Sequence, residues 1–236
     1  MQLPFFYINN YSPGQKSMVL DENNSRHIVQ VLRMETGERL HLTDGCGHLL
    51  TAIVTNPHKK HCEVAIEHSE FIPPAHPQIT IAIALLKNAS RFEWFLEKAT
   101  EIGVHAIVPL ITDRTEKIRT KTERLQNILV SALLQSRQVW LPQLPEPAKF
   151  TDFMNGPEWQ TTPQKFIAHC LEHEKASLRQ QSINNNTILL IGPEGDFTTN
   201  EIGAALENGY KAVTLGETRL RSETAGVVAA VLLCIK

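Results

Sequence analysis

Residues 187–225 decide the fold, and they read TILLIGPEGDFTTNEIGAALENGYKAVTLGETRLRSETA. Two short apolar runs in this stretch, 187–191 and 213–216, each end in a loop that contains glycine and then lead into a helix start. Pro193 lies between two glycines, so the first loop can turn sharply and bring bare backbone close to a ligand. Ligands of open α/β sheets bind outside the carboxyl ends of the strands. We therefore expect an α/β domain with a ligand site built from these two loops.

Helix signals surround both loops. Thr198 and Glu201 have the spacing of a capping box, and Gly209 is placed to end the helix that follows. Ser222 can cap the last helix, with Glu223 favourably placed in its first turn. A Gly-Pro-Glu-Gly segment alone is more often an ordinary strand-to-helix turn. Two such loops roughly twenty residues apart, as in successive β-α units, favour the ligand site over that alternative.

The rest of the second part of the chain alternates in the same way. From Gln78 onward, continuous apolar runs typical of buried strands alternate with amphipathic helical patterns. We expect strands at 79–86, 104–111 and 165–170, and helices at 92–102 and 125–133, the first of them ended by Gly103. This alternation predicts a parallel sheet covered by helices.

The first part of the chain reads as short strands broken by turns. We expect strands at 5–8, 39–43, 48–55 and 62–68, and one helix near 25–31. Asp44-Gly45 is a hairpin signal between two of these strands. The pattern predicts a small, barrel-like β domain over residues 1–72. Because 71–77 is rich in proline, we expect a stiff linker at 73–78 and a second domain over 79–236.

Composition excludes several classes of protein. The chain has 236 residues, of which 42% are hydrophobic and 20% charged, as in a soluble globular protein. No apolar run approaches the length of a bilayer span, and no signal-peptide pattern is present, so we expect no membrane partner. The four cysteines are scattered, which favours a reducing cytoplasm. A net charge of −2 argues against a surface that is basic throughout but permits a local basic face.

A metal site is the less favoured interpretation of one histidine-rich segment. His58-Lys59-Lys60-His61 precedes Cys62, with further His and Cys residues nearby in the sequence. Structural zinc normally uses repeated Cys or His pairs at set spacings, which this segment lacks. A solvated basic loop is favoured, and we expect no metal.

Several ordered motifs resemble a known family. Gly192-Pro-Glu-Gly195, Leu215-Gly216 and Leu220-Arg-Ser-Glu-Thr-Ala225 are similar to the S-adenosylmethionine site of the SPOUT, or trefoil-knotted, methyltransferases. They resemble most closely the family that methylates N3 of a uridine in 16S ribosomal RNA. The resemblance continues through the rest of the chain, at 27–33, Gly37, Asp44-Gly45, Leu86-Lys87, 98–104, Ile107, Pro109 and Arg114.

The resemblance implies an architecture and a set of partners. The fold would be an α/β parallel-sheet domain with a trefoil knot, preceded by a PUA-like RNA-binding β-barrel. The substrate would be 16S rRNA or the small ribosomal subunit, the cofactor S-adenosyl-L-methionine, and the protein a homodimer. A different interpretation is a non-catalytic RNA-binding or ribosome-assembly protein that retains the knot. A nucleotide-handling α/β enzyme acting on small molecules is disfavoured, because Gly-x-Gly-x-x-Gly and Walker-type loops are lacking.

The resemblance also implies which residues bind and react. Glu194 would bind polar groups of the methyl donor or accept the proton of uracil N3, and Arg221 or Arg114 would hold uracil oxygens or a phosphate. An ion pair between Arg221 and Glu223 is the structural alternative. The expected cofactor-binding residues are Leu190, Ile191, Gly192, Pro193, Glu194, Gly195, Leu215, Gly216, Arg219, Leu220, Thr224 and Ala225. The expected RNA-binding residues are Arg26, Arg33, Lys87, Arg114, Arg119 and Arg137.

The charge-dense segment 113–124 has a second interpretation. It carries three arginines and two lysines, and it suits a solvated loop leading into a helix as well as an RNA-facing patch. Asp196 is a departure from the family pattern, which more often has another glycine at this position, and it adds a carboxylate to the loop.

Overall fold

The computed structural model describes residues 3–116, 121–172 and 174–235. The chain divides into two compact units. Unit 1 combines Met1–Pro74 with the distant segment Leu133–Leu141, and unit 2 combines Ala75–Ala132 with Pro142–Lys236.

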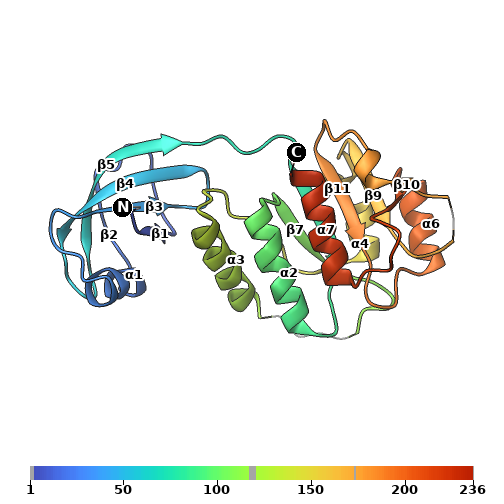
Figure 1. The fold of residues 1–236 in the computed structure, drawn as a ribbon, viewed down its shortest axis with the longest axis horizontal. Helices are drawn as coiled ribbons and strands as arrows, with labels where there is room; N and C mark the ends of the chain where they lie inside the picture. The colour runs from blue at the N-terminus through green and yellow to red at the C-terminus, as the bar shows by residue number, and fades with distance from the viewer. Residues whose placement is uncertain (1–2, 117–120, 173, 236) are drawn as a thin grey trace. The chain divides into compact units, whose positions relative to one another are not determined.

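Unit 1 is a curled five-stranded sheet with one helical segment (Figure 1). The strands follow the order β1-β3-β4-β5-β2, and only β1 and β3 run parallel. The predicted hairpin at Asp44-Gly45 is confirmed, because it joins the antiparallel strands β3 and β4. The elements are β1 (Phe5–Tyr7), β2 (Ser17–Val19), α1 (Glu22–Arg26), a π-helical turn (His27–Val31), β3 (Arg39–Thr43), β4 (His48–Asn56) and β5 (Glu63–Phe71).

The core of unit 1 follows from residue alternation along its strands. Leu40 and Leu42 of β3 point inward, as do alternate residues of β4, while the residues between them are more exposed. The buried Ser25 of α1 donates its hydroxyl hydrogen bond to the carbonyl of Leu20 and accepts one from the amide of Cys62. This pair of bonds fastens α1 to the strand end at Cys62, so a polar residue can lie in the core at little cost.

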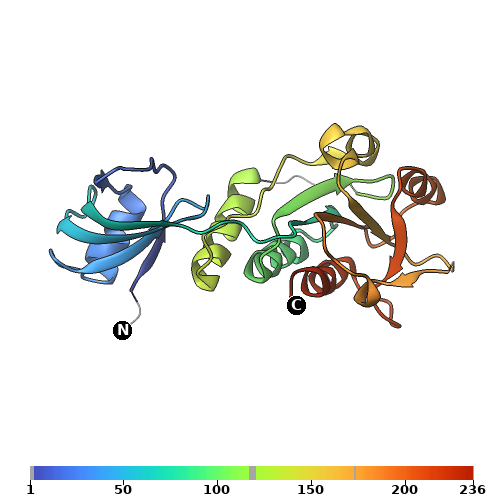
Figure 2. The same ribbon diagram turned by 90° about the horizontal axis from the view of Figure 1, so that it is seen from above.

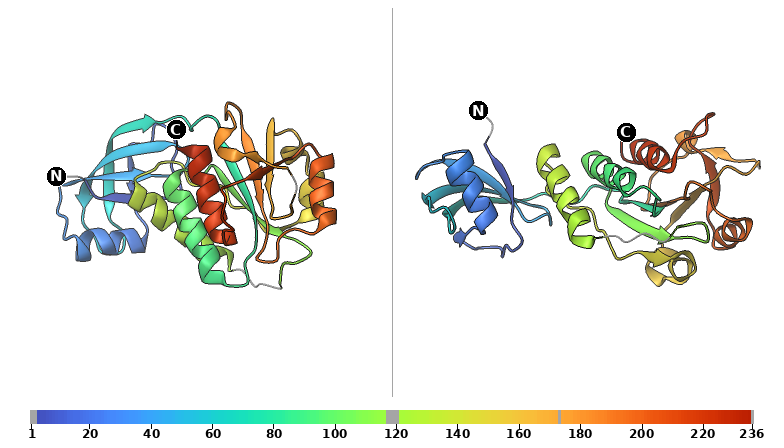
Figure 3. Two further views of the ribbon diagram at one scale, coloured as in Figure 1. Left: turned by 45° about the vertical axis from the view of Figure 1, so that its right-hand side comes forward. Right: turned by 90° about the horizontal axis from the view of Figure 1, so that it is seen from below.

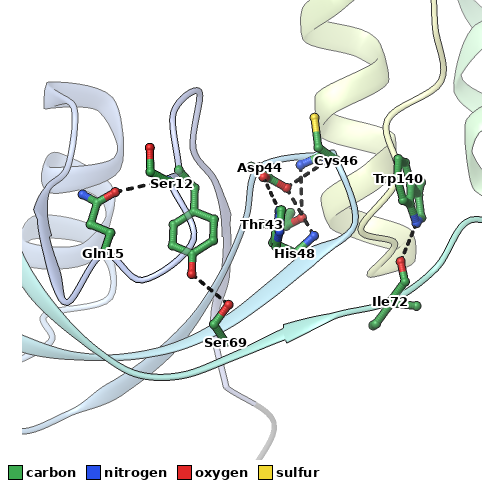
Figure 4. A network of polar contacts seen from close by, with 11 residues as sticks. Ser12, Gln15, Thr43, Asp44, Cys46, His48, Ser69, Ile72 and Trp140 are labelled. Carbon is green, nitrogen blue, oxygen red and sulfur yellow. Dashed lines mark hydrogen bonds and ion pairs between the residues drawn. The ribbon is translucent and has the colours of Figure 1, made fainter.

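Unit 1 includes Leu133–Leu141 because this segment is bonded to the ends of β4 and β5 (Figure 4). The Trp140 indole donates a hydrogen bond of 2.8 Å to the carbonyl of Ile72, and the Gly47 amide donates one of 2.8 Å to the carbonyl of Val139. Gly47 has φ +95°, and a Cβ there would lie 2.5 Å from the Trp140 ring, so only glycine fits. The Asp44 carboxylate accepts hydrogen bonds in the same turn, among them a contact of 2.7 Å with His48 Nδ1.

Unit 2 is a seven-stranded sheet flanked by helices on both faces (Figures 1 and 2). All strands run parallel, in the order β10-β12-β9-β11-β6-β7-β8. The elements are β6 (Ile79–Ala84), α2 (Ala89–Ile102), β7 (Ala106–Ile111), α3 (Thr122–Ser136), β8 (Ala148–Lys149), α4 (Phe150–Asn155), α5 (Pro157–Gln160), β9 (Gln164–Ala168), β10 (Ala176–Ser177), a 3-10 turn (Leu178–Gln180), β11 (Thr187–Ile191), α6 (Thr199–Glu207), β12 (Lys211–Thr214) and α7 (Ser222–Cys234).

The two faces of this sheet have different helical covers (Figure 3). Helices α2 and α7 pack against each other, α7 packs against β6, and Gly226 of α7 lies directly over the Phe95 ring of α2. On the other face, Phe150 and Phe153 of α4 pack with Ile202 of α6 over the sheet. Strands β6 and β11 are therefore buried on both faces, which explains their continuous apolar sequences.

The helix signals were read correctly in part. The capping box of Thr198 and Glu201 is confirmed, and Gly103 ends α2 with φ +92° as predicted. Asn208 is the C-cap of α6, and Gly209 follows it in the left-handed conformation. The predicted cap at Ser222 is wrong: the N-cap position of α7 is Arg221, and Ser222 is the buried first residue of the helix.

Within the described residues, no helix is long and apolar enough to cross a membrane.

Candidate active site

A cavity of about 450 Å³ lies in unit 2, where three parallel strands end. Strand β9 lies between β11 and β12 in the sheet, and the loops that follow these three strands form the walls. Ligand sites of this type of sheet occur at this edge, and the volume suits a small molecule. The lining residues are Ala168, His169, Cys170, Ile191, Gly192, Pro193, Glu194, Asp196, Val213, Thr214, Leu215, Gly216, Thr218, Arg219, Leu220, Arg221, Ser222 and Ala225.

The loop after β11 is a tight turn that exposes its backbone to the cavity. The Asp196 amide donates a hydrogen bond of 2.9 Å to the carbonyl of Pro193. A Cβ at Gly192 would lie 3.1 Å from both the ring and the amide nitrogen of Phe197, a buried core residue that cannot readily move. Gly192 is therefore needed where the backbone turns over Phe197, and its lack of a side chain leaves main-chain atoms at the cavity wall.

The loop after β12 forms the opposite wall and leads into α7. The Thr214 hydroxyl donates a hydrogen bond of 2.7 Å to the carbonyl of Gly216, which closes the first part of the loop. The first turn of α7 then contributes Ser222 and Ala225 to the cavity lining. The amino end of a helix presents free N–H groups and a partial positive charge, which favours carboxylates and other anionic groups.

Two further loops, after β6 and β7, are bonded to the loop after β11. The Lys87 amide donates a hydrogen bond of 3.2 Å to Glu194 Oε1, and the Arg114 guanidinium donates one to the carbonyl of Gly195. The Asp113 amide donates a bond of 2.9 Å to the buried carboxylate of Glu201, the capping-box residue of α6. Glu194 lines the cavity and Arg114 does not, although Arg114 is held to the neighbouring loop residue. These bonds bring the ends of β6, β7 and β11 together around Glu194.

Most of the predicted cofactor residues meet at this cavity. Nine of the twelve line it: Ile191, Gly192, Pro193, Glu194, Leu215, Gly216, Arg219, Leu220 and Ala225. Three lie outside the set of lining residues. The Leu190 side chain is buried in the core shared with α4 and α6, Gly195 faces the Arg114 side chain, and Thr224 precedes a lining residue on α7. Of the predicted catalytic residues, Arg221 lines the cavity together with Glu194.

Arg221 does not form the ion pair with Glu223 that was considered as its alternative role. Glu223 is buried, and its carboxylate forms an ion pair with Arg91 of α2 at 3.5 Å. Arg221 is exposed at the cavity, one residue before α7.

Sequence reasoning missed the wall formed after β9. Ala168, His169 and Cys170 line the cavity, as does Asp196, which had been noted only as a departure from a family pattern. The strand itself was predicted, but its place between β11 and β12 is not visible in the order of elements along the chain. A sequence signal for Cys170 was therefore limited to its position as the last residue of a predicted strand.

The predicted RNA-binding residues are distributed over both units. Arg26, Arg33 and Arg137 are exposed in unit 1, where Arg26 pairs with Glu22 at 2.8 Å and Arg137 donates a hydrogen bond to the carbonyl of Leu3. In unit 2, Lys87 is exposed and pairs with Glu116 at 3.0 Å, and Arg114 lies beside Gly195 as described above. Arg119 lies outside the described residues.

Arg124, at the end of the charge-dense segment, forms an ion pair with a helix of unit 2. Arg124 donates a 2.8 Å hydrogen bond to Glu93 of α2, and this bond lowers the pKa of the Glu93 carboxyl and raises the pKa of Arg124. Over residues 3–116, 121–172 and 174–235, no three His, Cys, Asp or Glu residues are grouped so that they could hold a metal ion. His58 and His61, from the segment considered for a metal, stack with ring centroids 5.6 Å apart.

Comparisons with known proteins define the class of this site. The family model described as "RNA methyltransferase domain" matches residues 74–234, and the one described as "RNA methyltransferase PUA domain" matches residues 20–67. The chain therefore carries the domains of an RNA methyltransferase.

Individual relatives identify the family within this class. A ribosomal RNA small subunit methyltransferase E from Synechocystis is 32% identical over 225 residues, which cover 91% of this chain and 72% of that protein. The crystal structure of a probable rRNA-methyltransferase from Porphyromonas gingivalis has a TM-score of 0.88 and 36% identity, covering 97% of this chain and 95% of that one. The chain belongs to the ribosomal RNA small subunit methyltransferase E family.

One of the structural relatives was crystallised with a cofactor. The ribosomal RNA small subunit methyltransferase E of Neisseria gonorrhoeae, in a crystal structure bound to S-adenosyl methionine, has a TM-score of 0.85 and 29% identity, covering 98% of this chain and 96% of that one. These matches confirm the predicted fold class, a SPOUT-type α/β knot domain preceded by a PUA-like domain.

Proposed function

We propose that this protein transfers a methyl group from S-adenosyl-L-methionine to N3 of a uridine in 16S ribosomal RNA. The observation that carries the proposal is the meeting of the Gly192–Gly195 loop and the Leu215–Ala225 segment at one cavity. Membership of the ribosomal RNA small subunit methyltransferase E family supports the reaction class and the substrate.

The cavity residues fit the proposed cofactor. S-adenosylmethionine, when bound, supplies an electrophilic methyl group on a positively charged sulfur. The carboxylate of Glu194 at the lining complements the positive charges of the cofactor, and the amino end of α7 complements its carboxylate. Gly192 and Gly216 leave main-chain groups available for the adenine and ribose. The volume of about 450 Å³ is in the range of sites for molecules of this size.

The side chains at the cavity supply what the acceptor needs. Uracil N3 carries a proton at neutral pH, and its lone pair becomes nucleophilic as that proton leaves. Glu194 is an exposed carboxylate at the cavity and serves in this proposal as the proton acceptor. Arg221, also exposed there, binds the uracil oxygens on which negative charge develops.

Arg114 has a positioning role in the proposal. Its guanidinium is bonded to the Gly195 carbonyl, so it holds the loop that carries Glu194. Its remaining N–H groups are available to a phosphate of the RNA.

The target must be a base that the enzyme can reach. A uridine inside a duplex hides N3 in the base pair, so the substrate is an unpaired or extruded uridine. Unit 1, which carries the exposed arginines Arg26, Arg33 and Arg137, binds the RNA backbone away from the target. We further propose that the protein acts in the cytoplasm as a homodimer, as expected for the SPOUT methyltransferases that it resembles.

The direct test is methyl transfer to small-subunit RNA or small ribosomal particles from a strain that lacks the modification. The product is digested and analysed by nucleoside mass spectrometry. We expect 3-methyluridine that depends on S-adenosylmethionine and is lost in Glu194→Gln. Methyl on ribose or on C5 would disprove the N3 assignment, whereas no transfer to any RNA, despite cofactor binding, would support the non-catalytic alternative.

A further inference from the structure

The loop after β9, of which residues 169–172 are described up to the gap, is held in place by charged side chains on two sides. This loop follows the strand that lies between β11 and β12, so it forms the middle of the cavity wall. The Cys170 amide donates a hydrogen bond of 2.7 Å to Asp196 Oδ2, which belongs to the loop after β11. The other oxygen, Asp196 Oδ1, accepts a bond of 2.8 Å from the Phe197 amide. One carboxylate therefore joins two cavity loops that are far apart in the sequence.

Lys175 binds the same loop through its carbonyl groups. Its ammonium donates hydrogen bonds of 2.8 Å to the carbonyl of His169 and 2.9 Å to the carbonyl of Leu171. A carboxylate therefore binds the main-chain N–H of Cys170, and an ammonium binds the carbonyls of the residues on either side of it. Hydrogen bonds to charged groups are stronger than neutral ones, so they fix a loop that has no secondary structure of its own.

The backbone of Asp196 supports a specific role for this residue. Asp196 has φ +64°, a conformation in which residues other than glycine are uncommon and aspartate is one of the tolerated exceptions. Glycine would adopt the turn without strain but would leave the Cys170 amide without its acceptor. Asparagine would also tolerate the turn, but its amide presents one acceptor oxygen and one donor nitrogen to two N–H groups. Aspartate meets both requirements.

We propose that Asp196 and Lys175 act together as positioning residues, a charged clamp that holds residues 169–171 in the conformation that receives the cofactor. The inference rests on the proposed binding of S-adenosylmethionine at this cavity. The clamp increases affinity by keeping the wall formed before binding, so that the cofactor need not order the loop itself. It acts on the adenosine-containing part of the ligand irrespective of the charge on sulfur.

The test compares the cofactor with its demethylated product by calorimetry. S-adenosylhomocysteine lacks the positive charge on sulfur but is otherwise the same ligand. We expect Asp196→Asn, Asp196→Gly and Lys175→Met to weaken both ligands by a similar factor, roughly 5- to 50-fold. Asp152→Asn, on α4 and outside the cavity lining, should change neither. A loss confined to S-adenosylmethionine would overturn the positioning role, because Asp196 would then act directly on the sulfonium charge.

Two further measurements isolate the clamp. The double variant Asp196→Asn/Lys175→Met should bind only slightly less tightly than the single variant with the larger loss of affinity, because either change alone already releases the loop. Multiplicative losses would contradict a joint action. Without any ligand, the Cys170 amide should exchange with deuterium faster in Asp196→Gly than in the wild type, and unchanged exchange would also overturn the proposal. Wild-type protein that binds neither ligand would refute the proposed function itself, whereas normal wild-type binding with unaffected variants would refute the clamp alone.

Discussion

Gly226 offers a sharp test of how α7 is packed. This glycine lies where α7 crosses α2, and a Cβ there would lie 2.6 Å and 2.7 Å from two atoms of the Phe95 ring and 3.2 Å from Ile83. Both neighbours are fully buried, so neither can move away freely. Alanine at an ordinary helix position gains about 1 kcal/mol over glycine, while overpacking a core costs about 1 to 3 kcal/mol. Because contacts this short belong at the upper end of that range, Gly226→Ala should lose about 2 kcal/mol of unfolding free energy.

Gly203→Ala is the matched control. Gly203 lies within α6, and a Cβ there would meet no atom within 4 Å. This variant should gain about 0.5 to 1 kcal/mol from helix propensity alone. The two substitutions are chemically identical, so the difference between them, about 3 kcal/mol, measures the packing term.

The assay is urea unfolding of the wild type and both variants, followed by circular dichroism. If the unfolding free energy falls with urea concentration at the same slope in all three proteins, differences in the midpoint report differences in stability. Gly226→Ala should also weaken cofactor binding, because Ala225, the preceding residue, lines the cavity. Equal stability of Gly226→Ala and Gly203→Ala would refute the close crossing of α7 over Phe95. A fall in both variants would instead indicate that substitutions in these helices are harmful for reasons unrelated to the crossing.

Three other predictions follow from the described contacts. Glu201→Gln should lower the unfolding free energy by about 1 to 3 kcal/mol, because the buried carboxylate that accepts a hydrogen bond from the Asp113 amide is replaced by a side chain with only one acceptor oxygen. Thermal unfolding measures this loss of stability, and an unchanged unfolding free energy would contradict the bond. Glu93→Gln should cost less than about 1 kcal/mol at pH 7, since the Glu93 pKa is lowered by its hydrogen bond to Arg124 and its partner is exposed. That contribution is present above the unfolded-state pKa and is lost as the pH falls through the folded-state pKa, so the two proteins should converge in acid unfolding series, and a constant gap would argue against the pair. Arg114→Met should reduce the rate of methyl transfer by roughly tenfold or more, while the affinity for S-adenosylmethionine falls by less. An equal loss of rate and affinity would mean that the guanidinium acts through cofactor binding instead.

Sequence patterns were sufficient for the features that depend on neighbouring residues. The buried strand at Thr187–Ile191, the capping box of α6 and the glycine end of α2 are each specified by a few adjacent residues, and all three are present. Short elements with weak patterns were not predicted. Strand β2 has three residues at the edge of its sheet, and α4 has six residues.

The contributions that sequence reasoning could not supply are contacts between distant segments. Nothing in the sequence links Trp140 to Ile72, whose carbonyl accepts the hydrogen bond of the Trp140 indole. The wall after β9 was missed because strand order is not written along the chain. Arg114 was expected to contact the substrate, and its bond to the Gly195 carbonyl depends on how two loops meet.

The membership of Leu133–Leu141 in unit 1 limits how the protein can be taken apart. The chain passes between the units at 74–75, 132–133 and 141–142, so a protease cut at the proline-rich linker leaves other covalent connections. A recombinant fragment that stops at Pro74 would lack Trp140 and Val139, and the Ile72 carbonyl and Gly47 amide would lose their partners. Grafting this PUA-like module onto another enzyme therefore requires transplanting a second, non-contiguous peptide along with it.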